Sequence, residues 1–331
     1  MDRRLAIAFV LAVAVAPALG ACGPAQEDRA PNSAATLVLD SRPAAVHTGI
    51  YMAVARGYDQ ALGVTLHVRA PDHAGPVKAI SSGRAQFAVL DIHDLAIARD
   101  RGLDLVGVMA LVQTPLAAIL AQPSIRTPRQ LEGHRVGVTR GPAGRAVLRS
   151  IVAGAGGDPA KVSVTRIGSG ATVAGLLAGR VAGVETSWAT DGVALQAQRP
   201  AIREFRVEDF GAPAYPELVL AVTRQTLQDE PNLVRATVAA LSRGYSEVLA
   251  DPESGVSALE QATGARASRD LQGGLDAVSP SFREGVQAFG ELVPARLRAW
   301  ARWEQRLGIV KRLPDVGRAF DGRYVPPDGR D

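Results

Sequence analysis

Residues 36–68 read TLVLDSRPAAVHTGIYMAVARGYDQALGVTLHV and contain two short apolar runs separated by a polar loop and a longer segment. The runs Thr36–Leu39 and Thr65–Val68 have the length and β-branched content of buried strands. Between them, His47–Gly57 has the length and apolar content of a helix. A strand, a helix and a second strand in this order predict parallel strands covered by helices.

Apolar runs and helix-like stretches continue to alternate beyond this unit. A second series begins after Gln122, the run Leu218–Thr223 starts a third, and the pattern then becomes helical, including a predicted helix over Pro280–Leu292. We therefore predict the α/β class, with two lobes, the second inserted into the first, and crossing segments near Ala118–Ser124 and Gly211–Pro216. The expected domains are residues 36–120 with 216–331 for the first lobe, and 121–215 for the second.

The amino-acid composition excludes several classes of protein. The chain has 331 residues, of which 47% are hydrophobic and 21% charged, and this excludes a disordered protein. The formal net charge is only +4, and basic residues form no run along the chain. A nucleic-acid surface needs clustered basic residues, so we expect no nucleic-acid partner. A single cysteine excludes a disulfide framework, a Cys-based zinc site and an iron–sulfur cluster.

The first 35 residues resemble an export signal followed by a tether. Two arginines precede an apolar stretch over residues 5–19, which is too short for a typical transmembrane helix. The sequence Leu-Gly-Ala-Cys ending at Cys22 resembles a bacterial lipobox. We expect residues 1–21 to be a signal peptide, Cys22 to be lipidated and residues 22–35 to be a polar tether, which places the body outside the cytoplasm on a bacterial membrane. The alternative is an ordinary signal peptide cut near Ala21.

Ligands of doubly wound sheets bind beyond the carboxyl ends of the strands, so residues that follow each expected strand are candidates. Ser41 and Arg42 follow the first strand, and His47 starts the next helix, whose free N–H groups suit an anionic or carbonyl-bearing ligand. His47 is equally well explained as a packing residue. Asp91 follows the third strand, and the nearby His93 and Asp94 make a metal site conceivable. The spacing does not match a zinc site, so we expect no metal.

Further candidates follow the later strands. Gln113 can read the edge of a heterocycle or cap a turn. Gly141 lies in a glycine-bearing turn that lacks the Gly-Lys-Ser/Thr ending of a phosphate loop. Trp188 is predicted to stack on a ligand, with core packing as the alternative. Tyr215 and Glu217 lie at the return crossing, where they can close the site, although Tyr215 can also simply pack there.

The chain contains no motif of a nucleophilic or metallopeptidase site and no dinucleotide-binding glycine pattern. It does contain five blocks in a distinctive order: HTGIYMAVARGY (47–58), SGRAQFAVLD (82–91), ALVQTPL (110–116), FRVEDFGAPAYPELVL (205–220) and VRATVAALSRGY (234–245).

In order and spacing these blocks resemble substrate-binding lipoproteins of ABC importers in the thiamine pyrimidine-precursor family. The resemblance covers about Thr36 to Phe320. It implies a type II periplasmic-binding-protein fold with a helical C-terminal region. It also implies a monomer without cofactor or catalysis, which captures a small aromatic heterocycle and delivers it to a membrane permease and its ATPase.

The resemblance also implies pocket residues, which are His47, Tyr51, Gln113, Trp188, Asp191, Tyr215 and Glu217. Two family motifs are altered here. The family's Asp-Trp-x-Pro-Asn reads Asp40-Ser41-Arg42-Pro43-Ala44, and its Trp-Asn-x-Glu reads Trp188-Ala189-Thr190-Asp191. Loss of an aromatic face and an amide beside Arg42 favours a ligand with an anionic group. The alternative is that Arg42 faces solvent and only the size of the pocket has changed.

Two other functions stay open on the same resemblance. Fungal relatives are pyrimidine synthases that hold pyridoxal phosphate on a lysine. The lysines of this chain are Lys78, Lys161 and Lys311, and none follows the third strand, where such a lysine is expected. A ligand sensor without a transport role is the other possibility.

Overall fold

The computed structural model describes residues 33–139, 141–168, 172–264 and 269–327. Cys22, the expected signal peptide and most of the expected tether lie outside these residues. The described chain begins directly in strand β1 (Ser33–Val38), which pairs in parallel with β2 (Val64–Arg69) from Ser33 onward. The last three residues assigned to the tether therefore belong to the first sheet, because their backbone groups complete its ladder.

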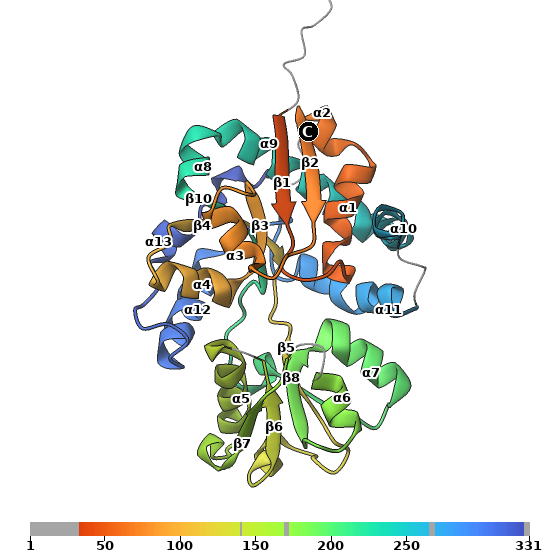
Figure 1. The fold of residues 1–331 in the computed structure, drawn as a ribbon, viewed down its shortest axis with the longest axis vertical. Coiled ribbons are helices and arrows are strands. Elements are labelled where there is room, and N and C mark those ends of the chain that lie inside the picture. The colour runs from red at the N-terminus through yellow and green to blue at the C-terminus, as the bar shows by residue number, and fades with distance from the viewer. Residues whose placement is uncertain (1–32, 140, 169–171, 265–268, 328–331) are drawn as a thin grey trace, which may run out of the picture. The chain divides into compact units, whose positions relative to one another are not determined.

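The first sheet has five strands in the order β2-β1-β3-β10-β4 (Figure 1). Strands β2, β1 and β3 (Phe87–Asp91) are parallel. Strand β10 (Leu218–Thr223) runs antiparallel to both β3 and β4 (Leu105–Val112), and Leu218 pairs with Asp91. The start of β10 therefore lies at the same edge of the sheet as the carboxyl end of β3.

The second sheet repeats this arrangement with the order β7-β6-β8-β5-β9 (Figure 1). Its three parallel strands are followed by β5, which runs antiparallel to both of its neighbours. The bounds are β5 Ala117–Ala121, β6 Arg135–Val138, β7 Ser163–Arg166, β8 Gly183–Ser187 and β9 Arg203–Arg206. The predicted α/β class with two sheets is confirmed, and along the chain the strands of the second sheet, β5–β9, lie between β4 and β10 of the first.

The first crossing segment differs from the expected one. We expected a link near Ala118–Ser124 and a lobe boundary after residue 120, but residues 117–121 form β5 in the second sheet. All five residues of β5 are buried, because the strand lies between β8 and β9 and is covered on both faces. The chain thus passes between the sheets at residues 113–116.

Helices cover the sheets, and several begin at residues suited to cap them. Asp91 accepts a hydrogen bond from the His93 N–H at the start of α4, and Asp251 does the same for Ser254 in α10. No helix among the described residues is both long and apolar enough to cross a membrane. The helices are α1 Thr48–Ala55, α2 Tyr58–Ala61, α3 Gly75–Ser81, α4 Ile92–Asp100, α5 Pro142–Gly154, α6 Thr172–Leu177, α7 Val193–Gln198, α8 Arg224–Asp229, α9 Pro231–Ala250, α10 Pro252–Thr263, α11 Arg269–Val278, α12 Pro294–Arg306 and α13 Val316–Ala319.

The expected helix over Pro280–Leu292 is wrong. Only a short 3₁₀ turn, Ser279–Phe282, forms in this region. Gly285 and Gly290 have φ angles of 66° and 91°, which lie in the left-handed region and interrupt a helix.

Helices α1 and α9 approach closely through two glycines. A Cβ atom at Gly244 would lie 2.1 Å from the carbonyl oxygen of Gly49, and one at Gly49 would lie 2.2 Å from Tyr245 Cγ. Tyr245 itself stacks on Phe289 at a centroid distance of 4.3 Å and donates a hydrogen bond of 2.6 Å to the Val46 carbonyl. Side chains larger than hydrogen at the two glycines would therefore separate the helices.

We expect Gly244→Ala to lower the free energy of unfolding by about 1–3 kcal/mol, because backbone rather than a movable side chain blocks the added methyl group. Gly273→Ala is the matched control: its nearest neighbour, Val193 Cγ1, is 3.6 Å from the new Cβ. The control should be neutral or slightly stabilising, since alanine favours helix over glycine. Urea denaturation of both variants measures the difference, and equal stabilities would contradict the close packing.

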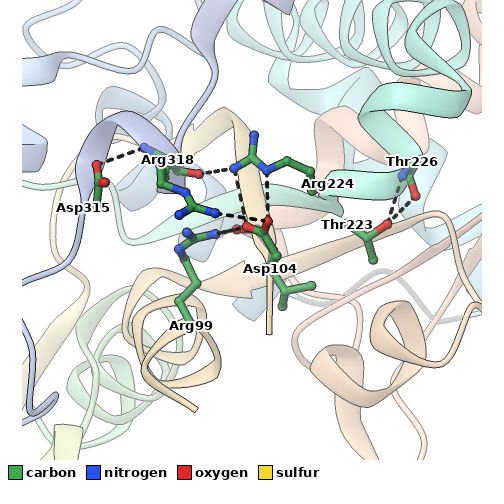
Figure 2. Close-up of polar contacts among 8 residues, drawn as sticks. Arg99, Asp104, Thr223, Arg224, Thr226, Asp315 and Arg318 are labelled. Atoms are coloured by element: carbon green, nitrogen blue, oxygen red, sulfur yellow. Dashed lines mark hydrogen bonds and ion pairs between the residues drawn. The ribbon is translucent and has the colours of Figure 1, made fainter. Parts of the chain in front are cut away.

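One carboxylate ties the C-terminal segment to the first sheet (Figure 2). Asp104 accepts hydrogen bonds from Arg99 at 2.9 Å and from Arg224 at 3.1 Å, and Arg318 lies 3.8 Å away. Arg224 also donates to the carbonyl oxygen of Arg318, within α13. Burial raises the pKa of Asp104, but the bonds from Arg224 and Arg99 outweigh it and hold the pKa below its usual value. The cluster therefore joins α4, α8 and α13.

Candidate functional site

A cavity of about 320 Å³ lies among residues at the ends of strands in both sheets. Asp40 follows β1, Asp91 ends β3, and Thr139 follows β6. Glu217 precedes β10, which starts at that same edge because it runs antiparallel. The lining is Asp40, Ser41, Ala44, Val46, Asp91, Leu116, Ala117, Thr139, Glu185, Thr186, Ser187, Thr190, Glu217 and Leu218. This is the position at which α/β sheets bind ligands.

Four carboxylates dominate the charge of this lining, and they are Asp40, Asp91, Glu185 and Glu217. No lysine, arginine or histidine is among the described lining residues. Ser41 and four hydroxyl groups of the second lobe supply the remaining polar side chains. The cavity is therefore suited to positive charge and to hydrogen-bond donors.

Glu185 is held in place from the second sheet. The backbone N–H and the hydroxyl of Thr139 both donate to its Oε2, at 2.9 and 2.6 Å. A Cβ atom at Gly144, in the first turn of α5, would lie 2.6 Å from the same oxygen. Glycine at position 144 thus lets the start of α5 approach the carboxylate closely.

Glu217 connects the two crossing segments. Its Oε2 accepts a 2.9 Å hydrogen bond from the Leu116 N–H, and its carbonyl oxygen accepts one of 2.9 Å from the Ile92 N–H. Burial raises the pKa of Glu217, opposed by the positive charge of His93. Burial likewise raises the pKa of Asp91 well above its usual value. Both groups have been moved from water into a site rich in negative charge.

His47 orients Asp40 rather than the ligand. The Ala44 N–H donates to His47 Nδ1 at 3.1 Å, and His47 Nε2 hydrogen-bonds Asp40 Oδ1 at 2.7 Å. Burial raises the pKa of Asp40, but attraction and hydrogen bonding to His47 outweigh it and the net pKa is lowered. His47 is fully buried, and it positions a lining carboxylate without lining the cavity itself.

Of the residues predicted from sequence, the structure brings Ser41, Asp91 and Glu217 together in the cavity. Arg42 is exposed and absent from the lining. Gly141 lies in a separate groove at the start of α5. Tyr51 is part of the core of the first lobe.

Trp188 is also outside the lining. Its Nε1 donates to the Pro115 carbonyl oxygen at 3.0 Å, its ring is 3% exposed, and the Arg206 guanidinium lies 3.9 Å from the ring centroid. The indole therefore packs against the first crossing segment, and a cation occupies one of its faces. Asp191 accepts a 2.5 Å hydrogen bond from Thr186 and does not line the cavity either.

The side chains of Gln113 and Tyr215 bond to residues outside the cavity. Gln113 Nε2 donates to the Glu291 carbonyl oxygen at 2.9 Å. The Tyr215 hydroxyl lies 3.3 Å from His93 Nε2, and its ring contacts His93 and Trp303. Both side chains are buried and outside the lining.

Sequence reasoning missed Asp40, Thr139 and Glu185 as lining residues. The signal was present, because Asp40 follows the first expected strand and the other two end the apolar runs 135–139 and 181–185. The same strand-end rule that selected Asp91 applies to them. Arg42 and Trp188 have more conspicuous chemistry in the sequence, but both side chains lie outside the cavity lining.

Comparison with known proteins shows the family of the chain. The chain matches the family described as NMT1/THI5 like over residues 44–255, which is more than half of its length. It is 28% identical over 228 residues to the formylaminopyrimidine-binding protein of Halalkalibacterium halodurans, covering 67% of this chain and 68% of the relative.

Solved structures show the same fold. The aliphatic sulphonate-binding protein SsuA of Escherichia coli superposes with a TM-score of 0.71 at 15% identity, covering 91% of this chain and 96% of that one. The desulfurization enzyme DSZB superposes with a TM-score of 0.60 at 13% identity, covering 88% and 97%. The predicted periplasmic-binding-protein fold is confirmed, and the chain belongs to the NMT1/THI5-like family.

Proposed function

We propose that this protein is the solute-binding receptor of an ABC importer and that it captures a small heterocycle rich in N–H donors, of the aminopyrimidine class. The observation that carries the proposal is the cavity at the strand ends, whose described lining contains four carboxylates. Membership of the NMT1/THI5-like family and the similarity to a formylaminopyrimidine-binding protein support the same ligand class.

The chemistry of the lining selects against an anion. Ionised carboxylates only accept hydrogen bonds, so ring amino groups and protonated ring nitrogens complement them. We expected an anionic group on the ligand because of Arg42, but this side chain is exposed and outside the lining. A volume of about 320 Å³ matches a small heterocycle.

Binding in this cavity couples the ligand to both lobes. Glu185 belongs to the second sheet, whereas Asp40 and Asp91 belong to the first, and Glu217 joins the crossing segments. A ligand that contacts carboxylates from both sides favours the arrangement in which they are closest. That arrangement is the form we propose for delivery to a permease.

We also propose export of the chain as a monomer and its attachment to the outer face of a bacterial membrane through lipid on Cys22. The lipobox-like ending of the leader supports this, and Cys22 lies outside the described residues. The mass of the mature N-terminal peptide tests it: an unmodified Cys22 would contradict the anchor.

We further propose that the protein is not an enzyme. The fold alone does not decide this, since DSZB has it too. A pyridoxal-phosphate enzyme needs a lysine at the cofactor, and the three lysines of the chain, all of them described, are absent from the cavity lining.

Calorimetric titration with matched heterocycles tests the ligand class. A formylaminopyrimidine should bind at least about tenfold more tightly than the same ring carrying a carboxylate or sulfonate, since each tenfold is about 1.4 kcal/mol. Tighter binding of the anionic partner would contradict the proposed class. Absence of binding by every member of the set would contradict the receptor function itself.

A further inference from the structure

Exposed arginines lie along α12 and around a groove at its end, although they are distant in sequence. Arg298, Arg302 and Arg306 follow one another at four-residue spacing on α12, and all three are exposed. The opposite side of α12 is buried through residues that include Trp300 and Trp303. At four-residue spacing the three guanidinium groups share one face of the helix.

The row ends at Arg306, and the next residue, Leu307, lines a groove at the end of α12. The groove has a volume of about 790 Å³, and its lining consists of Gly141, Pro142, Arg145, Arg149, Arg166, Leu307 and Gly308. Arg149 donates a 3.3 Å hydrogen bond to the Leu307 carbonyl oxygen, which links α5 of the second lobe to the end of α12 in the first. We call Arg298, Arg302, Arg306, Arg145, Arg149 and Arg166 together the arginine ridge.

The six arginines of the arginine ridge form no ion pair with a described carboxylate. Among the described residues no carboxylate lines the groove at the end of α12. Asp315 lines a separate groove beside Arg298 and Arg302 without pairing with either. The arginines around Asp104 differ, because they share that carboxylate (Figure 2). Six positive charges exceed the formal net charge of +4, so the rest of the chain is net acidic. Basic residues form no run in the sequence, so this clustering arises only in the folded chain.

Like charges at four-residue spacing destabilise a helix, so the fold does not require this arrangement. We propose that the arginine ridge is the docking surface for an acidic polypeptide segment of a partner protein. Guanidinium groups bind carboxylates in pairs of parallel hydrogen bonds, and six of them match a segment with several acidic residues.

Shape distinguishes this occupant from other anions. A groove of about 790 Å³ is far larger than a single inorganic anion, and the ridge extends beyond it along α12. A bilayer surface is broad and does not enter a concave groove between two helices. A protruding chain segment both enters the groove and reaches α12. Because the groove is lined by both lobes, such a partner contacts both at once.

Fluorescence anisotropy with a labelled decaglutamate peptide and the full chain tests the docking surface. Arg145→Gln with Arg166→Gln should weaken binding by about tenfold or more, and Arg298→Gln with Arg302→Gln should weaken it as well. The control is Arg180→Gln with Arg199→Gln, an exposed pair in the second lobe that removes the same charge, and it should change affinity by less than about twofold. Unchanged melting temperatures show that the variants fold.

Three outcomes would overturn the proposal. One is absence of peptide binding by the wild type at low salt, and another is an equal loss in the ridge and control pairs, which would reflect net charge alone. The third is preferential, ridge-dependent binding to phosphatidylglycerol vesicles over the peptide, which would assign the ridge to a lipid surface. None of these measurements involves the cavity ligand. A negative result would therefore contradict the docking surface without contradicting the proposed receptor function.

Discussion

Replacing Glu304 by alanine is expected to lower the free energy of unfolding by about 3–5 kcal/mol, because it leaves a buried cation without its partner. The side chain of Glu304 is fully buried and pairs with Nδ1 of His93, whose side chain is 4% exposed. Tyr215 and Trp303 enclose the imidazole at centroid distances of 5.4 and 5.8 Å. Water therefore has little access to replace the lost carboxylate.

Urea denaturation at neutral pH measures the loss. The double variant His93→Leu with Glu304→Leu is the matched control, since replacing both partners with apolar groups removes the unpaired charge and should recover much of the stability. A loss below about 1 kcal/mol in Glu304→Ala would contradict the role of the pair. A double variant as unstable as the single one would attribute the effect to packing.

The pair of His93 and Glu304 also makes the free energy of unfolding depend on pH above neutrality. Burial alone would lower the pKa of His93, but Glu304 and Asp91 outweigh it and raise the pKa to about 10. The pKa of histidine in the unfolded chain is about 6.5, and below that pH the pair contributes its full stabilisation. This stabilisation is lost as pH rises through the pKa of His93 in the folded protein. The wild type should therefore lose stability between about pH 7 and pH 10, and Glu304→Ala should show a much shallower decline.

Neutralising two cavity carboxylates is expected to weaken ligand binding by about 100-fold, or about 3 kcal/mol, since each charged acceptor contributes roughly 1.5–3 kcal/mol. The variant is Glu185→Gln with Glu217→Gln. The glutamine oxygens can still accept the hydrogen bonds from Thr139 and from the Leu116 N–H, so the backbone around the site should be retained. Calorimetry with a formylaminopyrimidine measures the change.

Asp191→Asn is the matched control for this experiment. Asp191 is an acidic residue close to the cavity that bonds Thr186 but does not line the site. Its variant should bind within about threefold of the wild type. Equal loss in both variants, or wild-type affinity in the double variant, would show that the carboxylates of the lining do not contact the ligand.

Protons should compete with the ligand at these groups. Burial raises the pKa of Glu217 and of Asp91, so both become protonated at higher pH than free carboxyl groups do. Protonation removes the charge that a donor-rich ligand needs, and affinity should therefore fall as pH is lowered below neutrality. The double variant should lose part of this dependence, because one of the two raised groups no longer titrates.

Local sequence was enough to predict the α/β fold and most strands. Short apolar runs such as Thr36–Leu39 and Thr65–Val68 become strands that bury apolar side chains, and that pattern is readable without contacts. The strand-end rule pointed to Ser41 and Asp91, and the return crossing to Glu217; all three line the cavity, because strand order sets which edge of the sheet they occupy.

Tertiary structure alone decided the direction in which side chains point. Trp188 and Arg42 have the chemistry of ligand-binding residues, but the bond to Pro115 turns the indole into the crossing segment and Arg42 lies exposed. Strand β5 lies between two partners that follow it by more than 60 residues, which no local pattern reveals. The arginine ridge likewise joins α5 and α12, which are far apart in sequence. Periodicity determines local elements, whereas charge clusters and cavities depend on long-range contacts that form only when the chain folds.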